Sequence, residues 1–349
     1  MNINKLEQKF PQNHIVIDNL GAASVMVYIK KFYLDEVISG ASHIPHPAFI
    51  VDGKELDGIY ISKFQNVVID GHAYSLPDQD PATNIDFDSA IRSCAVKGNG
   101  FHLMTAMEWG AIALWCQKNG WLPHGNNDMG KDVREEDLVA NISYYNEEKS
   151  ICRTATGSGP VEWSHNRDIS GIYDLNANVW EWVGGIRLVY GELQILPNNN
   201  GASARYSQCS SSEDWRAIDG TTGELLVPGE NTSNSIKLDF NDDRWGYVTD
   251  KITSSLDNFR FCNFSDLTCS PSICNKAQEL LMSLGCLPCP DYKEHSVSFY
   301  ANNGASERIP FRGGRWGQGL NAGIFKSCFD DPRTYSGDAV GFRSAYYEA

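Results

Sequence analysis

The chain has 349 residues, 42% of them hydrophobic, and a formal net charge of −15. This apolar content is normal for a packed globular protein and argues against intrinsic disorder. Because an acidic chain without a basic run is repelled by phosphates, nucleic acid and anionic membrane surfaces are excluded as expected partners. The start, Met1 to Lys5, is polar and no long apolar run follows, so we expect neither a signal peptide nor membrane insertion, and synthesis in the cytoplasm.

Residues 1–13 are predicted to form a polar lead-in. Residues 14–349 are predicted to form a single α+β domain with much irregular structure, because no linker or repeat interrupts the chain. Runs rich in β-branched residues predict strands at 14–18, 24–29, 48–51 and 58–64. The Asp52-Gly53 pair is a hairpin turn signal, so the last two of these strands are expected to pair with each other.

Two helices are expected after this β-rich part. Asp86 is placed to cap a helix over 87–97. Thr105 and Glu108 form a capping box that opens a second helix, which runs to Lys118. Beyond them the regular signals fade into long connections, and two further short elements are predicted: a strand at 191–196 and a helix at 272–284.

An oxygen-rich turn precedes the Trp-Glu-Trp sequence at 180–182. Asp174 and Glu181 carry hard oxygen ligands, and Ala177 and Val179 can offer backbone carbonyls within the same turn. Such oxygens suit Ca²⁺. The alternative is a turn whose acids cap backbone amides, with the two tryptophans in the core.

The ten cysteines do not indicate a disulfide framework, because a chain of this size does not need disulfides for stability and shows no export signal. Cys286 and Cys289 have the spacing of half a zinc site or of a redox pair, but no second half is visible, which favours two small buried residues. The chain also holds no nucleophile elbow, phosphate loop or zinc-protease motif.

The C-terminal stretch, 312–345, has two rigid ends and a loop-like middle. Arg-Gly-Gly-Arg-Trp at 312–316 and Gly-Phe-Arg at 341–343 enclose a segment dominated by Gly, Asn, Asp, Ser and Tyr. This composition is typical of adaptable binding loops. Two interpretations remain: a displayed binding surface, or an ordinary surface hairpin that ends in a strand at 339–346.

Four motifs occur in a characteristic order, at 100–109, 171–182, 312–316 and 341–343. In this order they resemble the formylglycine-generating-enzyme (sulfatase-modifying factor) superfamily over 48–349. The resemblance implies an α+β fold of the elaborated C-type lectin kind. It also implies a Ca²⁺ loop with ligands at Asp174, Ala177, Val179 and Glu181.

Catalytic members of this superfamily bind copper through a cysteine pair shortly before the final Gly-Phe-Arg. In the present chain those two positions are Phe325 and Asp330, and Cys328 between them has no partner. A single thiol does not supply the paired thiolates that Cu(I) prefers. We therefore expect a protein that is not an enzyme.

The stretch from Trp316 to Ala345 is more narrowly similar to the variable region of diversity-generating-retroelement target proteins, where adenine-directed mutagenesis rewrites scattered codons. The likeness implies a fixed frame made of Trp316, Gly319, Asn321, Ala322, Gly323, Phe325, Arg333, Gly341, Phe342 and Arg343. It implies diversified, ligand-binding positions at Gly317, Gln318, Leu320, Lys326, Cys328, Asp330, Asp331, Tyr335, Gly337, Asp338 and Ala339. Cys328 is expected on an exposed loop, and Arg315 among the structural supports.

Together these features predict a non-catalytic protein that recognises a macromolecular ligand, a protein or a surface glycan, and that is displayed on a phage virion or a cell surface. One alternative is a formylglycine-generating-type copper oxidoreductase that acts on a protein cysteine. Another is a calcium-stabilised structural module such as a tail-fibre tip. The sequence predicts neither the ligand's identity nor the oligomeric state.

Overall fold

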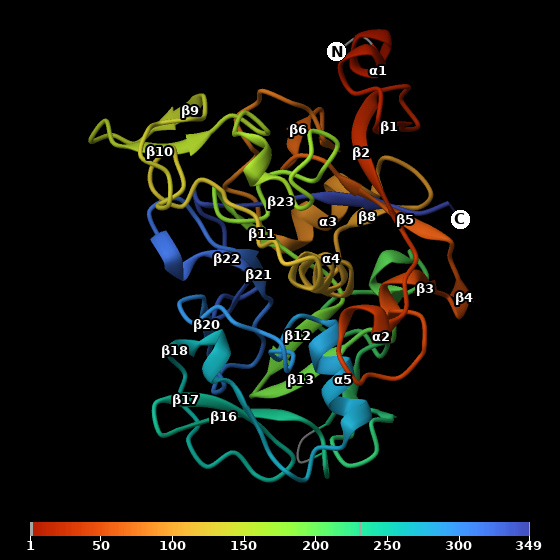
Figure 1. Cartoon of the computed structure of the whole chain (residues 1–349). Helices are drawn as coiled ribbons and strands as arrows, with labels where there is room; N and C mark the ends of the chain where they lie inside the picture. The colour runs from red at the N-terminus through yellow and green to blue at the C-terminus, as the bar shows by residue number, and fades with distance from the viewer. Residues whose placement is uncertain (1–2, 230–231, 349) are drawn as a thin grey trace.

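The computed structural model describes residues 3–229 and 232–348 and arranges three larger sheets around the buried helix α4 (Figure 1). The α-helices are α1 Ile3–Lys9, α2 Leu34–Val37, α3 Phe87–Ala95, α4 Ala106–Lys118 and α5 Asn275–Ser283. Single 3₁₀ turns are η1 Pro47–Phe49, η2 Val161–Trp163, η3 Asn200–Ala202, η4 Phe264–Asp266 and η5 Gly319–Asn321. The mixture confirms the predicted α+β class.

The first sheet brings the two ends of the chain together. Its strand order is β1-β2-β5-β24-β8. The strands are β1 His14–Ile17, β2 Ala23–Lys30, β5 Gly58–Ser62, β24 Ser344–Tyr346 and β8 Phe101–Leu103. The last strand of the chain, β24, is antiparallel to both of its neighbours, β5 and β8, and so lies inside the sheet.

The second sheet carries the C-terminal segment. Its order is β18-β20-β22-β21-β11-β23. The strands are β18 Arg260–Asn263, β20 Ser298–Ala301, β22 Gly323–Phe329, β21 Phe311–Gly313, β11 Trp180–Trp182 and β23 Val340–Phe342. Two pairs, β20 with β22 and β11 with β23, run parallel, and the other pairs are antiparallel.

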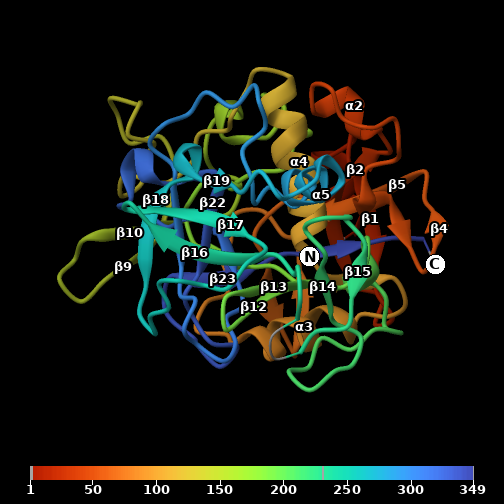
Figure 2. The same cartoon turned by 90° about the horizontal axis from the view of Figure 1, so that it is seen from below.

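The third sheet lies in the lower part of Figure 1, and Figure 2 shows its strands β16 and β17 from below. Its order is β15-β14-β13-β16-β17-β19, with β12 also paired to β13. The strands are β12 Ile186–Val189, β13 Glu192–Ile195, β14 Arg216–Ile218, β15 Leu225–Leu226, β16 Lys237–Asn241, β17 Arg244–Val248 and β19 Thr268–Cys269. Three two-stranded hairpins are β3 Ile50–Val51 with β4 Lys54–Glu55, β6 Val67–Ile69 with β7 His72–Tyr74, and β9 Ile142–Tyr145 with β10 Ile151–Thr154.

The predicted caps form as expected. The Asp86 carboxylate accepts the backbone N–H of Ser89 at 2.7 Å and opens α3. At the start of α4, the Thr105 hydroxyl and the Glu108 carboxylate each accept the other residue's backbone N–H. Helix α4 is buried along nearly its whole length, and its Trp109 indole donates to the carbonyl of Ile324 at 2.6 Å. The helix therefore supports β22 directly.

Two expectations near the N-terminus need correction. The Asp52-Gly53 turn closes only the short β3–β4 hairpin, whereas residues 58–62 pair with β2, because buried Ile59 and Ile61 pack against the main core in that register. The polar lead-in contains the short helix α1, whose Leu6 is buried. Within 3–229 and 232–348, no helix is long and apolar enough to cross a membrane.

Candidate ligand-binding surface

The fixed frame is held by buried arginines. Arg343 is fully buried, and its Nε and Nη2 each donate to the Glu181 carboxylate at 2.6 Å. It also donates to the carbonyls of Ser62 and Tyr173. One guanidinium thus joins the first sheet, the 174–181 loop and the C-terminal segment, because its planar donors reach several acceptors at once.

A second arginine fixes the far end of the segment. Arg333 binds the Glu307 carboxylate through Nε at 2.7 Å and Nη2 at 2.9 Å, and it donates to Asp88 at the start of α3 at 2.8 Å. Trp316 and Phe342 are buried, as expected of supports. Arg315 differs from expectation, because its side chain is exposed and lies over the Trp316 ring, 5.7 Å from the ring centroid.

Most of the predicted variable positions reach solvent. Gly317, Leu320, Tyr335 and Asp338 are exposed, with Tyr335 at 39% and Leu320 at 55%. Five more are partly exposed: Gln318, Asp330, Asp331, Gly337 and Ala339. Gly317 has φ +77°, a left-handed conformation that glycine and asparagine adopt more readily than other residues. Side chains other than these two are therefore strained at this position.

Two of the predicted positions, Lys326 and Cys328, are buried instead. They alternate along β22, which has β20 on one side and β21 on the other, so the expectation that Cys328 lies on an exposed loop is wrong. Burial raises the pKa of the Cys328 thiol and keeps it protonated. Whether codons at these two positions vary stays a prediction.

Lys326 is buried, and no carboxylate among the described residues pairs with it. Its ammonium donates to the carbonyl of Asn321 at 2.8 Å and to the Ser298 hydroxyl at 3.2 Å. It lies 5.0 Å from the ring centroid of Tyr300 and 5.3 Å from that of Trp180. Burial lowers the pKa of Lys326 to about 7, because a charged ammonium is poorly solvated there.

Aromatic side chains outside the predicted variable positions continue the same face of the sheet, which we call the outer face. The strand register places Phe261, Tyr300, Cys328 and Phe311 side by side across four strands. Phe261 is 57% exposed on edge strand β18 and stacks on Tyr300, with ring centroids 5.3 Å apart. Phe259, 51% exposed, lies next to the same tyrosine. On this face the exposed rings of Phe259 and Phe261 border Tyr300, which packs against a buried cluster that contains Cys328 and Phe311. The exposed Tyr335 lies beyond that cluster, with its ring centroid 6.2 Å from that of Phe311.

The sequence did not single out these rings. Phe259 and Phe261 alternate with Arg260 in a polar stretch, which is the available signal for a half-exposed strand. Only the pairing of β18 with β20, and of β20 with β22, shows that this strand borders the C-terminal segment.

The two positions that correspond to the copper-binding pair are not suited to a metal. Phe325 faces the core on the opposite side of β22, where its ring contacts those of Phe264 and Tyr292. Asp330 follows the end of the strand, beside Asn302. Among the residues that the structure describes, no group of three or more His, Cys, Asp or Glu side chains could hold a metal ion. Cys286 and Cys289 are both buried in the main core.

The four predicted calcium ligands do converge on one point, and a nitrogen atom occupies it. Nε2 of Gln65 lies 3.2 Å from the carbonyl oxygens of Asp174 and Ala177, 3.1 Å from that of Val179 and 3.0 Å from Oε1 of Glu181. Asp174 contributes its backbone carbonyl to this group of oxygens. The oxygens match the donor type of a hard cation, but the amide fills the space that an ion would need.

The carboxylate of Asp174 points elsewhere. Its Oδ2 accepts the backbone N–H of Gly157 at 2.9 Å, while its Oδ1 is buried without a hydrogen-bond partner. Burial raises the pKa of Asp174 to about 6. Calcium at this loop therefore stays a prediction that the surrounding contacts do not favour.

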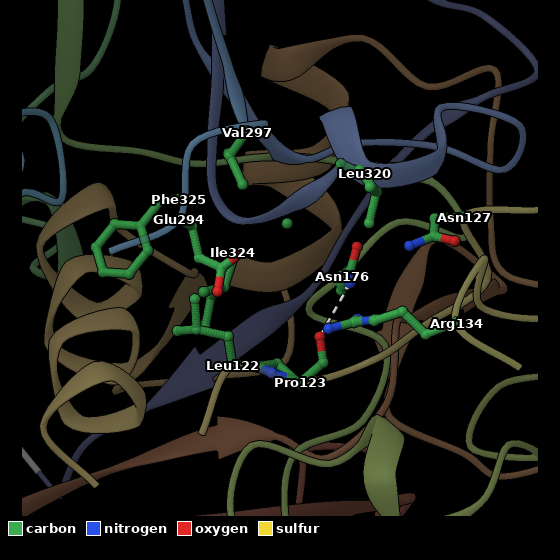
Figure 3. Close-up of a pocket in the computed structure, with 12 residues that line it drawn as sticks. Leu122, Pro123, Asn127, Arg134, Asn176, Glu294, Val297, Leu320, Ile324 and Phe325 are labelled. Carbon is green, nitrogen blue, oxygen red and sulfur yellow. Dashed lines mark hydrogen bonds between the residues drawn. The ribbon is translucent and has the colours of Figure 1, made fainter. Parts of the chain in front are cut away.

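The cavity beside the segment is small (Figure 3). It measures about 30 Å³, close to the volume of one water molecule, and Leu320, Ile324 and Asn127 are among its lining residues. Asn176 donates to the carbonyl of Pro123 at 2.9 Å, and its own buried oxygen has no partner. A small-molecule pocket needs about ten times this volume. A larger cavity, about 430 Å³, lies away from the segment, against β2 and α4.

Residues 8–203 match the model of the sulfatase-modifying factor enzyme 1-like domain, which is more than half of the chain. The chain belongs to this family. It has the family's α+β fold of the C-type lectin type, with much irregular structure. The match ends before β22 and does not include the C-terminal segment that is predicted to vary.

The chain is also similar to several solved structures. PvdO from Pseudomonas aeruginosa is 13% identical, with 96% of this chain and 98% of that chain covered and a TM-score of 0.37. Treponema denticola variable protein 1 is 13% identical, with 96% and 99% covered and a TM-score of 0.31. The Major Tropism Determinant P3c variant is 9% identical, with 93% and 58% covered and a TM-score of 0.32. Among curated proteins no match was found.

Proposed function

We propose that this member of the family is a non-catalytic protein that binds a macromolecular ligand through a diversified C-terminal surface. The observation that carries the proposal is the separation of the segment into two sets. Most frame residues, among them Arg343, Phe342 and Ala322, are buried, although Asn321 is exposed and Gly319 and Arg333 are partly exposed. Most of the interleaved positions that are predicted to vary reach solvent. A fold can tolerate change only where side chains do not form its core.

The chemistry of the segment supports binding rather than catalysis. Membership of the family alone would suggest copper-dependent oxidation of a protein cysteine. Phe325 and Asp330 stand at the positions of the copper pair, and the one thiol nearby is buried and protonated. Soft Cu(I) sites are built from accessible thiolates, which this segment lacks.

The outer face has the properties of a contact surface for a protein or a surface glycan. Exposed Phe259, Phe261 and Tyr335 offer apolar area, and the carboxylates of Asp331 and Asp338 lie near Tyr335. Aromatic rings with polar neighbours dominate the binding energy of many interfaces. Display of this face on a phage virion or a cell surface is part of the proposal.

A pair of libraries tests the proposal. In the first library, four accessible positions are randomised: Gln318, Leu320, Tyr335 and Asp338. Because these side chains make few core contacts, most members should fold with Tm within a few degrees of the parent. Selection against hen lysozyme, used as a probe ligand, should yield variants that bind lysozyme more tightly than the parent chain does. Surface plasmon resonance measures the affinities.

The matched control library randomises four frame positions: Ala322, Phe325, Arg333 and Phe342. Its members should be largely unfolded, because each of these side chains is buried or bonded in the frame. If the first library unfolds as often as the control, or folds but yields no binder, the segment is not a display surface.

A further inference from the structure

The turn at 174–181 is shaped around a single point. Asp174, Ala177 and Asn178 all have left-handed φ angles, of 62°, 63° and 59°. Such angles are unfavourable for a residue with a Cβ, and for alanine no side-chain hydrogen bond compensates. A turn of this kind persists only where surrounding contacts hold it, and here these include backbone hydrogen bonds from Ala177 and Asn178 and groups that bind the inward-facing carbonyl oxygens.

The group that binds them is a side chain from a distant part of the sequence. Gln65 is fully buried in the connection between β5 and β6. Its Nε2 contacts one oxygen from each of Asp174, Ala177, Val179 and Glu181, at 3.0–3.2 Å. Calcium would sit about 2.3–2.6 Å from the same oxygens. The oxygens are arranged as in an ion site, but each lies slightly farther from the central atom than it would from calcium.

A chain of hydrogen bonds fixes the orientation of this amide. The backbone N–H of Thr154 can only donate, and it donates to Oδ1 of Asn178 at 2.9 Å. The Nδ2 of Asn178 must therefore be the donor to Oε1 of Gln65, at 2.9 Å. This leaves Nε2 of Gln65 facing the four oxygens, and a flipped amide would bring oxygen against oxygen.

The one carboxylate that faces this point already has a cationic partner. Glu181 is the charged member of the oxygen group, and Arg343 binds both of its carboxylate oxygens. A divalent cation at the same point would place two further positive charges beside the buried Arg343 guanidinium, while the second buried carboxylate of the turn, that of Asp174, is directed to the backbone N–H of Gly157. In a poorly solvated interior that arrangement is unfavourable.

We propose that the amide of Gln65 takes the place of a bound divalent cation in this turn, so that the scaffold behind the binding surface is held without a metal. The turn keeps the geometry of an ion site, and a neutral amide nitrogen with two N–H donors lies at its centre, within 3.2 Å of all four oxygens. Removing the side chain beyond Cβ should therefore convert the turn into a cation site. The proposal does not depend on what the outer face binds.

Three proteins test this: the full-length wild type, Gln65→Ala and Gln65→Met. Each is melted in EDTA and in millimolar CaCl₂. The wild type should have the same Tm in both. Gln65→Ala should lose roughly 5 °C in EDTA, because buried acceptors lose their donor. It should recover several degrees in calcium, since an ion that binds only the folded state stabilises it.

Gln65→Met is the matched control, because methionine fills the same space without a donor. It should be destabilised like the alanine variant and should not respond to calcium. A calcium-dependent Tm of the wild type, or calcium binding at this turn by isothermal titration calorimetry, would overturn the proposal. So would a folded Gln65→Ala protein that responds to calcium no more than Gln65→Met does. If Gln65→Ala does not fold, the wild-type calorimetry alone decides.

Discussion

At the scale of single residues, Lys326 is an unusual member of a buried strand. Its ammonium has two neutral oxygen acceptors and two aromatic rings around it. The nearest groups that affect its charge are Cys328, whose thiol is protonated, and the guanidinium of Arg315. The Lys326 ammonium therefore loses its proton more readily in the folded protein than in the unfolded chain.

This gives a pH dependence with a defined sign. The pKa of Lys326 is about 7 in the folded state, against 10.5 ordinarily. Between these values the unfolded chain binds the extra proton, so the free energy of unfolding should rise as pH rises from 7 to 10. Lys326→Met removes this contribution. The stability of the wild type relative to this variant should increase on the order of 3 kcal/mol across the window.

Urea unfolding at several pH values from 7 to 10 measures this difference. Lys54→Met on the exposed strand β4 is the control, and its difference from the wild type should not depend on pH. A constant difference between the wild type and Lys326→Met would show that the ammonium is solvated and that β22 is open to solvent at this point.

At the scale of elements, the two faces of the second sheet differ. Phe261 on β18 is exposed on the outer face, while Phe299 on the adjacent strand β20 is fully buried on the inner face. Phe299→Ala should lower the free energy of unfolding by roughly 3–5 kcal/mol. Phe261→Ala should change it by no more than about 0.5 kcal/mol, as is usual for surface positions.

Denaturant midpoints of these two variants provide the measurement, and they form a matched pair because the same side chain is removed from neighbouring strands. Equal losses would mean that the outer face is covered, which would remove the constant aromatic part of the proposed contact surface.

The elements that the sequence predicted well are those whose signals lie in adjacent residues. Helices α3 and α4 begin at capping residues that lie next to the helix itself, so Asp86 and Thr105 were sufficient to place them. The burial of β22 could not be predicted in this way. It follows from pairing with β20 and from the rings of Tyr300 and Trp180, which lie far from Lys326 in the sequence.

The turn at 174–181 shows the same limit. Its oxygen donors were recognisable from the residue types and spacing. The donor that satisfies them, Gln65, is 109 residues from Asp174 in sequence, and no motif links the two. Sequence patterns predict the oxygen acceptors of a turn, whereas the tertiary fold determines which donor binds them.

At the scale of the whole molecule, the final residues complete two sheets. β23 pairs in parallel with β11, and β24 lies between β5 and β8. A chain that ends after Ala339 lacks both strands and Arg343, and leaves Glu181 buried without its partner. It should show no cooperative thermal transition by circular dichroism, because losing one member of a buried ion pair alone costs about 3–5 kcal/mol.

Deletion of residues 1–9 is the control of similar length. It removes only α1, with its single buried side chain Leu6, and should lower Tm while keeping a cooperative transition. A truncated chain that still melts cooperatively would show that the C-terminal strands are dispensable.

The interior position of β24 has a consequence for protein synthesis. The C-terminal segment 312–339 is translated shortly before this strand, so a stop codon or frameshift within the segment removes β24 as well. A chain that is altered in this way cannot close the first sheet, and unfolded chains are removed by cellular proteases. Under the proposed function, only variants that are translated in frame through β24 would fold and be displayed.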